Sequence, residues 1–230
     1  MKPAIVRLDR FETGAAEFIS EAMRNALSRS GTYRLGLAGG MTPAAIYEKL
    51  ALGAEAISWE QVQITFGDER CVGPDHADSN YRMARERLLA KVNLPAENVH
   101  RIRGELAPEV AAHEYETILR SMAAQRGEER YVHDLLLLGL GPDGHTASLF
   151  PGSPALQETE RDVIATIGTK PPPQRVTMTL PLINAARHIC FLVNDPAKQP
   201  VLDEILRGNA ALPATHVQPV SGALTWLIAR

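Results

Sequence analysis

The sequence has little cysteine, since its 230 residues include only Cys71 and Cys190, which lie far apart with no paired-cysteine spacing. This pattern indicates neither a disulfide framework nor a cysteine-based zinc site. No apolar run approaches the roughly 20 residues that span a bilayer. The first residues also lack the long apolar region and cleavage site of a signal peptide. We therefore expect a cytoplasmic protein with no membrane association.

The chain also lacks an excess of either charge, because 24 basic and 27 acidic residues leave a net charge of −3. This balance does not favour nucleic acid as a partner. None of the seven histidines has metal-ligand spacing such as H-E-x-x-H, so no metal site is expected. The 45% hydrophobic content and the length are typical of one core, and we expect a single domain over residues 1–230.

Apolar strand patterns alternate with helical patterns along the chain. This alternation predicts an α/β fold with a doubly wound, mainly parallel sheet and helices on both faces. The predicted strands are residues 4–8, 33–37, 62–66, 99–102, 135–138, 163–167, 175–179, 189–193 and 224–229. The predicted helices are residues 12–29, 43–52, 81–91, 107–125, 182–187 and 198–206, the first of them ended by a glycine cap at Gly31.

The most informative stretch, residues 134–151, reads DLLLLGLGPDGHTASLFP. Its apolar run is typical of a strand buried on both faces, and its three glycines allow turns that a Cβ would block. His145 then follows at the start of a predicted helix, beyond a strand end, where open α/β sheets bind ligands. A histidine at such a position can have a purely structural role, as a helix cap or in a polar pocket, but these surroundings favour a catalytic role. Asp143 is close enough to orient the imidazole or stabilise its protonated form.

A second glycine turn, AGGMTP at residues 38–43, joins a predicted strand to a predicted helix. Gly39 and Gly40 expose backbone N–H groups, while Thr42 can serve as the helix N-cap before Pro43 at the first helical position. The positive end of the helix dipole would then face the turn and favour a phosphate. The turn is neither a Walker loop nor a dinucleotide fingerprint. Taken alone, it favours a plain strand-to-helix connection over a binding site.

Charged side chains follow the predicted strand at residues 62–66, in the sequence GDER. The two acids, Asp68 and Glu69, can orient hydroxyl groups while the forked donors of Arg70 hold an anion such as phosphate. A surface ion pair, with Asp78 or Ser79 as N-cap of the next helix, explains the same residues equally well. Two further basic residues are isolated in the sequence. Arg175 begins a predicted strand and Lys198 begins a predicted helix, and each alone is typical of a solvent-facing side chain.

Together these segments resemble the 6-phosphogluconolactonase family, the lactonases of the oxidative pentose phosphate pathway. The matching stretches run from residue 38 to about residue 200: AGGMTP, TFGDERCVGPDHADSNYRMARERLL, LLLLGLGPDGHTASLFPG, PPPQRVTMTLPLIN and the helix carrying Lys198. GPDGHTASLFP is the most specific of them. The related glucosamine-6-phosphate deaminases have M-D-E-Y and G-H-I-A-F-N-E-P where this chain has GDER and GHTASLFP.

The resemblance implies a three-layer α/β/α, Rossmann-like fold shared with those deaminases. It implies hydrolysis of a sugar-phosphate lactone, 6-phospho-D-glucono-1,5-lactone, to 6-phospho-D-gluconate without a metal or organic cofactor. His145 would be the general base that activates water, with Asp143 beside it in the catalytic turn. The residues that match substrate-binding positions of the family are Gly39, Gly40, Thr42, Asp68, Arg70, Gly144, Arg175 and Lys198.

The chain departs from the family pattern at three places. Met41 replaces the usual serine of the first turn, Lys198 follows NDPA where a glycine is commoner, and the terminal TWLIAR lacks an aspartate after the tryptophan. Two other functions are considered: a sugar-phosphate isomerase or deaminase, and a non-catalytic sugar-phosphate sensor. Retention of His145 and Asp143 argues against the sensor. We expect a monomer or a weak homo-oligomer.

Overall fold

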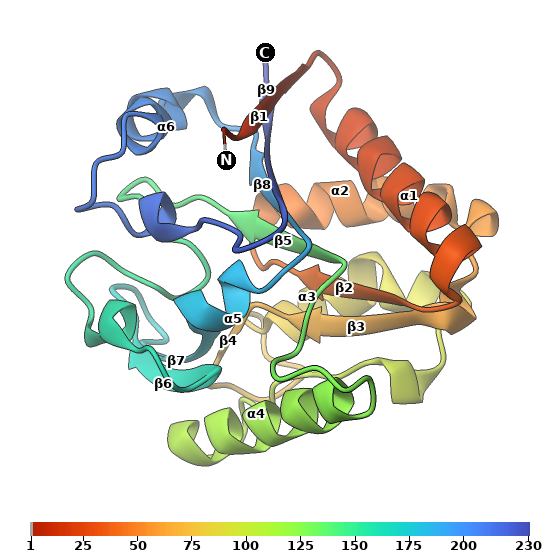
Figure 1. The fold of residues 1–230 in the computed structure, drawn as a ribbon, viewed down its shortest axis with the longest axis horizontal. Coiled ribbons are helices and arrows are strands. Elements are labelled where there is room, and N and C mark those ends of the chain that lie inside the picture. The colour runs from red at the N-terminus through yellow and green to blue at the C-terminus, as the bar shows by residue number, and fades with distance from the viewer. Residues whose placement is uncertain (1) are drawn as a thin grey trace.

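The computed structural model describes residues 2–230, and a six-stranded parallel sheet forms its centre (Figure 1). Strand β2 is buried along its whole length, and the four leucines of β5 are at most 1% exposed, as their apolar runs predict. The strand order is β1 (Ala4–Leu8), β9 (Ala223–Ala229), β8 (His188–Val193), β5 (Leu135–Gly139), β2 (Tyr33–Leu37) and β3 (Val62–Phe66). The chain runs outward from β2 to β3 and then returns to the other side of β2 at β5. The carboxyl ends of β2 and β5 therefore flank the topological switch point, where such sheets bind ligands.

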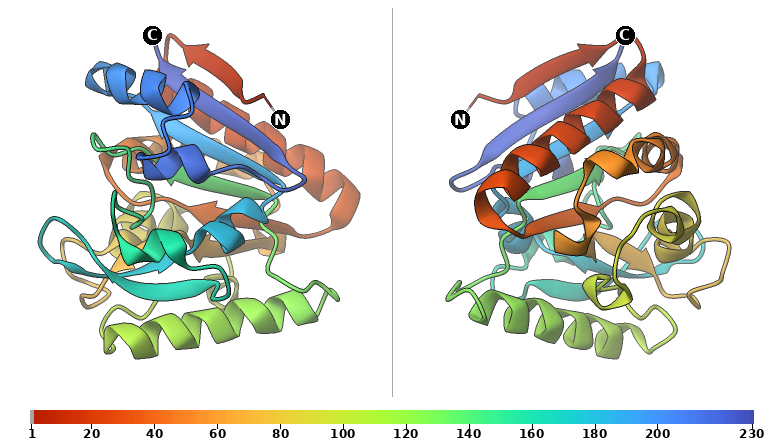
Figure 2. Two further views of the ribbon diagram at one scale, coloured as in Figure 1. Left: turned by 60° about the vertical axis from the view of Figure 1, so that its left-hand side comes forward. Right: turned by 90° about the vertical axis from the view of Figure 1, so that its right-hand side faces the viewer.

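Helices cover both faces of this sheet, which confirms the predicted three-layer α/β/α fold. Helix α1 lies on one face and α6 on the other (Figure 2). The helices are α1 (Phe11–Ser30), α2 (Met41–Leu52), α3 (Asn80–Arg87), α4 (Pro108–Ala124), α5 (Leu180–Asn184) and α6 (Gln199–Leu206). Gly31 ends α1 in the left-handed conformation with φ 68°, and its N–H donates to the carbonyl of Leu27, as the sequence predicts. No helix of residues 2–230 is long and apolar enough to cross a membrane.

A second, antiparallel sheet lies beside the first and was not predicted. It consists of β4 (Asp68–Arg70), β7 (Gln174–Met178) and β6 (Val163–Ile167) in that order, and α4 packs against β6 and β7 (Figure 2). The sequence indicates β6 and β7 as strands but not their separate pairing. It gives no strand signal for β4, which is three residues long and polar. This small sheet brings residues 68–70 and Arg175 to the carboxyl edge of the main sheet.

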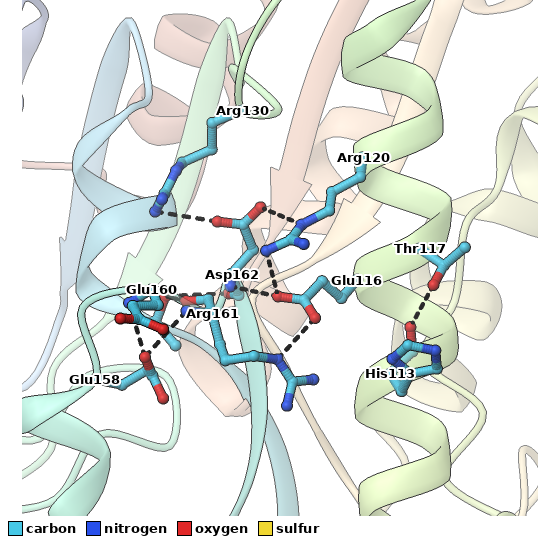
Figure 3. A network of polar contacts seen from close by, with 10 residues as sticks. His113, Glu116, Thr117, Arg120, Arg130, Glu158, Glu160, Arg161 and Asp162 are labelled. Atoms are coloured by element: carbon cyan, nitrogen blue, oxygen red, sulfur yellow. Dashed lines mark hydrogen bonds and ion pairs between the residues drawn. The ribbon is translucent and has the colours of Figure 1, made fainter.

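An ion-pair network fastens α4 to the small sheet (Figure 3). Glu116 of α4 accepts hydrogen bonds from the Asp162 N–H at 2.6 Å and from Arg161 Nε at 2.8 Å. The Asp162 carboxylate, which precedes β6, pairs with Arg130 at 3.0 Å and Arg120 at 3.5 Å. Both acids are nearly buried, and burial raises the pKa of Asp162. Because these buried carboxylates meet arginines, the network holds the two layers together without an unpaired acid.

Outside the glycine turn of His145, and apart from small shifts at element ends, the structure differs from the predicted elements at two places. Residues 99–102 do not form a strand, because only a single bridge links Val99 to Ile64 before the chain turns away. The helix expected at residues 81–91 is shorter, since α3 ends at Arg87 and one 3₁₀ turn, Leu89–Lys91, follows it. Ile102 in the first segment and Leu88 and Leu89 in the second are buried, but the backbone does not continue the regular pattern.

Candidate active site

The glycine turn after β5 places His145 at the switch point. The Gly141 N–H donates to the His145 carbonyl at 2.8 Å, and the Gly144 N–H, at φ 78°, donates to the Gly141 carbonyl at 3.1 Å. The predicted helix after His145 is absent. Instead, the Thr146 hydroxyl donates to the Gly139 carbonyl at 2.9 Å, and Thr146 pairs with Leu149 in a short bridge. The chain thus folds back on itself and holds His145 on a closed loop.

His145 and Asp143 form a hydrogen-bonded pair. Nδ1 of His145 lies 2.5 Å from Oδ1 of Asp143, and the same oxygen accepts the His145 backbone N–H at 3.2 Å. Burial raises the pKa of Asp143, but the hydrogen bond and charge of His145 outweigh this effect and lower it overall. A carboxylate acceptor keeps a proton on Nδ1, so the lone pair of Nε2 is available as a base. The imidazole also packs against the Phe150 ring, with 4.6 Å between centroids.

Only glycine fits at position 141 beside this pair. A Cβ there would lie 2.1 Å from Nδ1 of His145 and 2.8 Å from Oδ1 of Asp143, both well inside contact distance. Gly144 has a different role, because a Cβ there would meet the Leu212 side chain at 2.9 Å and the site cavities do not include it. Of the predicted site residues, Gly144 is therefore the one that shapes the turn without facing the site.

A cavity of about 250 Å³ opens between the ends of β2 and β5. Helix α2 points its N-terminus into it. The N-cap is Gly40, at φ 104°, so the prediction that Thr42 caps this helix is wrong: Thr42 is the second helical residue. Gly40 has no side chain to cap the first N–H groups of α2, which leaves the positive end of the helix facing the cavity. Seven predicted residues line this cavity: Gly39, Gly40, Thr42, Asp68, Arg70, His145 and Lys198.

Strand β4 carries three charged residues, and each has a distinct environment. The carboxylate of Asp68 accepts hydrogen bonds from Ser148 Oγ at 2.6 Å and Asn80 Nδ2 at 3.2 Å, which fix its orientation. Arg70 donates through Nη1 to the Asp78 carbonyl at 2.6 Å. Ser79, one of the two residues predicted for the role, is the N-cap of α3. The GDER segment is therefore part of the site and also leads into a capped helix.

Glu69, which the sequence suggested as an acid that orients hydroxyl groups, instead fixes the loop that follows β4. Its buried carboxylate accepts the backbone N–H groups of Arg70, Asn80 and Tyr81 at 2.7–2.8 Å and the Ser79 hydroxyl at 3.0 Å. Burial raises the pKa of Glu69, while these N–H groups oppose the rise. The four bonds tie β4 to the start of α3 and so set the position of Arg70.

Two buried tyrosines hold the strand ends that enter the site, and sequence patterns alone did not indicate them. The Tyr47 hydroxyl, from α2, accepts the Ala38 N–H and donates to the Ala38 carbonyl, both at 2.9 Å. The Tyr115 hydroxyl, from α4, does the same for Phe66, at 2.8 and 3.1 Å. Each hydroxyl therefore satisfies a backbone group where a strand stops pairing. A strand end followed by a buried helical tyrosine is the signal that could have suggested them.

A second cavity of about 300 Å³ adjoins the first, and both are lined by Asp68, Arg70 and His145. The second cavity is lined in addition by Asp143 and Arg175. Arg175 is only 6% exposed, so the sequence-based reading of a solvent-facing side chain is wrong. Lys198 is half-buried at the end of a 3₁₀ turn, Pro196–Lys198. Within the described chain, no cluster of three or more His, Cys, Asp or Glu residues could hold a metal.

The fold and the site define an α/β enzyme with a hydrogen-bonded histidine–aspartate pair at the switch point of a parallel sheet, beside basic groups suited to an anionic substrate. The family model described as glucosamine-6-phosphate isomerases/6-phosphogluconolactonase matches residues 7–226, and the chain belongs to this family. It is 42% identical over 214 residues to a 6-phosphogluconolactonase of Synechocystis, covering 91% of this chain and 87% of the relative. It is also 42% identical over 227 residues to the human 6-phosphogluconolactonase, covering 94% and 87%.

Solved structures give the same result. The 6-phosphogluconolactonase of Thermotoga maritima is 31% identical with a TM-score of 0.88, and the match covers all of both chains. That of Trypanosoma brucei is 31% identical with a TM-score of 0.86, covering 99% of this chain and 96% of the other. A monomeric glucosamine-6-phosphate deaminase, at 20% identity and a TM-score of 0.82, shares the fold.

Proposed function

We infer that this chain is a lactonase that hydrolyses 6-phospho-D-glucono-1,5-lactone to 6-phospho-D-gluconate. The observation that carries this function is the His145–Asp143 pair beside a cavity with basic walls, in a chain 42% identical to enzymes named 6-phosphogluconolactonase. The deaminase alternative is not favoured, because the deaminase structure shares the fold at only 20% identity. A lactone is an activated ester, so a positioned base and an anion site suffice for its hydrolysis.

In the proposed mechanism, Nε2 of His145 accepts a proton from water as the water oxygen bonds to C1. The imidazolium is stabilised by the Asp143 carboxylate, which its Nδ1–H already contacts. As the tetrahedral intermediate collapses, the bond between C1 and the ring oxygen breaks, and His145 returns the proton to that oxygen. The carboxylic acid formed at C1 then releases its proton to solvent. General-base catalysis of this kind contributes about 10²–10⁴-fold to the rate.

The phosphate of the substrate fits the first cavity. Its partners there would be the N-terminus of α2, Lys198 and Arg70, and no carboxylate of the described chain lies within ion-pair distance of either base. Helix N-termini and basic side chains together are the usual protein site for a phosphate. Because the phosphate does not change during hydrolysis, these contacts should act mainly on KM.

We further propose that residues 1–230 act as one domain, in the cytoplasm, as a monomer or weak homo-oligomer with no nucleic-acid partner. Buried residues from the first helix to the last strand form one hydrophobic cluster, which supports a single domain. The net charge of −3 supports the absence of a nucleic-acid partner. Some relatives carry a different location in their names, such as the chloroplastic rice proteins.

The direct test is turnover of freshly generated 6-phosphogluconolactone, followed by acid release and corrected for spontaneous hydrolysis. We expect rapid, enzyme-dependent opening of the lactone and no ammonia release from glucosamine 6-phosphate. Ammonia release without lactone opening would instead assign the chain to the deaminase branch of the family. Binding of 6-phosphogluconate without any turnover would indicate the sensor.

A further inference from the structure

Two arginines lie opposite each other across the small sheet. In the antiparallel register of β4 and β7, Arg70 pairs with Arg175. Directly opposite residues project from the same face of a sheet, and like charges in such a pair are destabilising. Within residues 2–230, neither guanidinium has a carboxylate within ion-pair distance. The small sheet therefore holds a pair of positive charges that the nearby acids Asp68, Glu69 and Asp78 offset at Arg175 only from beyond ion-pair distance.

Arg175 is the more unusual of the two. It is 6% exposed, and within residues 2–230 its guanidinium makes one hydrogen bond, from Nη2 to the Lys170 carbonyl at 3.1 Å. Its Nε and Nη1 are buried and have no acceptor among these residues. Burial lowers the pKa of Arg175, and the nearby charge of Arg70 lowers it further. A buried guanidinium with free donors is costly unless an anion completes its bonding.

The cavity beside Arg175 is the second one, of about 300 Å³, which meets the first cavity at His145. Its charged walls include the cations of Arg70, Lys170 and Arg175. The acids on the same walls are occupied elsewhere: Asp143 is bonded to His145, Asp68 to Ser148 and Asn80, and the exposed Asp78 faces His76 at 3.6 Å. Among the charged groups of these walls, the hydrogen-bond donors left without an acceptor in residues 2–230 are therefore those of Arg175.

The order of the two cavities sets which end of the substrate each receives. The α2 N-terminus and Lys198 line the first cavity only, and Arg175 lines the second only. His145, whose base must reach C1, lines both. If the phosphate at C6 occupies the first cavity, then the oxygen atoms on C1 lie on the side of His145 that faces Arg175.

We propose that Arg175 binds the C1 end of the substrate, where it receives the oxygen that becomes negative during water attack and then the carboxylate of the product. This inference rests on the proposed lactonase function. The forked donors of an arginine match a carboxylate in a two-point contact. Residues 169–171 line the cavity and the Lys170 carbonyl accepts from Nη2, so a two-point contact that uses Nη2 would require this carbonyl to give up its hydrogen bond.

The test compares two ligands that differ only at C1. Calorimetric titration measures binding of 6-phosphogluconate and of glucitol 6-phosphate, which keeps the phosphate and carbon chain but has CH₂OH in place of the carboxylate. In Arg175→Met, we expect 6-phosphogluconate to bind about 10- to 100-fold more weakly and glucitol 6-phosphate to be almost unaffected. Arg175→Lys should recover part of the preference. Lys198→Met should weaken both ligands.

Arg24→Gln serves as the matched control, because it removes one positive charge from an exposed position of α1 and should leave both affinities unchanged. Equal weakening of both ligands in folded Arg175→Met and Arg175→Lys would overturn the proposal and give Arg175 a structural or phosphate-binding role. A folded Arg175→Met protein that keeps the wild-type preference for 6-phosphogluconate over glucitol 6-phosphate would also overturn it. Failure of the wild type to open the lactone would refute the proposed function instead. A wild type that turns over lactone but does not distinguish the two ligands would refute only the C1 subsite.

Discussion

Replacing Gly141 with alanine should misalign the His145–Asp143 pair without removing either side chain. The new Cβ would lie 2.1 Å from Nδ1 of His145, whereas ordinary contact of a Cβ begins at 3.4 Å. Relief of the clash therefore takes a shift of about 1.3 Å, the difference between these distances. A displacement of about 1 Å can cost about 100-fold in rate. We expect kcat to fall by about 100-fold, which corresponds to ~2.7 kcal/mol of activation free energy.

The assay is stopped-flow hydrolysis of freshly generated lactone with a pH indicator, corrected for the spontaneous reaction. Gly73→Ala is the matched control, because a Cβ at that position meets nothing within 4 Å and kcat should not change. Thermal unfolding shows whether both variants are folded. A folded Gly141→Ala enzyme with the wild-type kcat would show that the precise placement of the imidazole is not needed, and would refute the reasoning.

Three further predictions concern binding and stability. Lys198→Ala should raise KM about 10-fold or more while kcat changes little, because the phosphate contact is the same in the ground and transition states; steady-state kinetics checks this, and a loss confined to kcat would contradict it. Burial, aided by Arg34, lowers the pKa of His133 to about 3, so between pH 6.5 and 3 the unfolded chain binds a proton that the folded chain does not. The free energy of unfolding should therefore fall by about 1.4 kcal/mol per pH unit on acidification through this window, and urea titrations of His133→Gln should lack that contribution. Glu69→Ala leaves four donors without their acceptor and should lower the free energy of unfolding, measured by urea denaturation, by about 3 kcal/mol. A loss below about 0.5 kcal/mol would show that the hydrogen bonds of Glu69 do not fix the loop after β4.

The parallel sheet could be predicted because its central strands β2 and β5 are buried on both faces. A run such as Leu135–Leu138 has no polar side that could face water, so burial alone determines the strand. The antiparallel sheet could not be predicted in this way. Asp68–Arg70 is short and charged, and it is a strand only because Gln174–Met178, distant in sequence, supplies its hydrogen bonds. The hydrophobic pattern within one segment does not show which distant segment will pair with it.

The same division holds for the site. His145 and Asp143 could be predicted because they lie in one turn, two residues apart, where chain geometry places them together. The prediction that Thr42 caps α2 was wrong because Gly40, with a positive φ, is the N-cap. The helix therefore begins at Met41, earlier than the position of Pro43 suggests. Glu69 and Tyr47 support the site through contacts with residues that only the tertiary fold brings near.

The central claim, that His145 is the base that activates water, is tested most directly by His145→Ala in single-turnover and steady-state hydrolysis of fresh lactone. The spontaneous rate is subtracted, and binding of 6-phosphogluconate is measured in the same preparation to show that the site is intact. We expect a kcat lowered by about 10²–10⁴-fold with KM and product affinity close to those of the wild type. A folded His145→Ala enzyme that retains the wild-type kcat would contradict it.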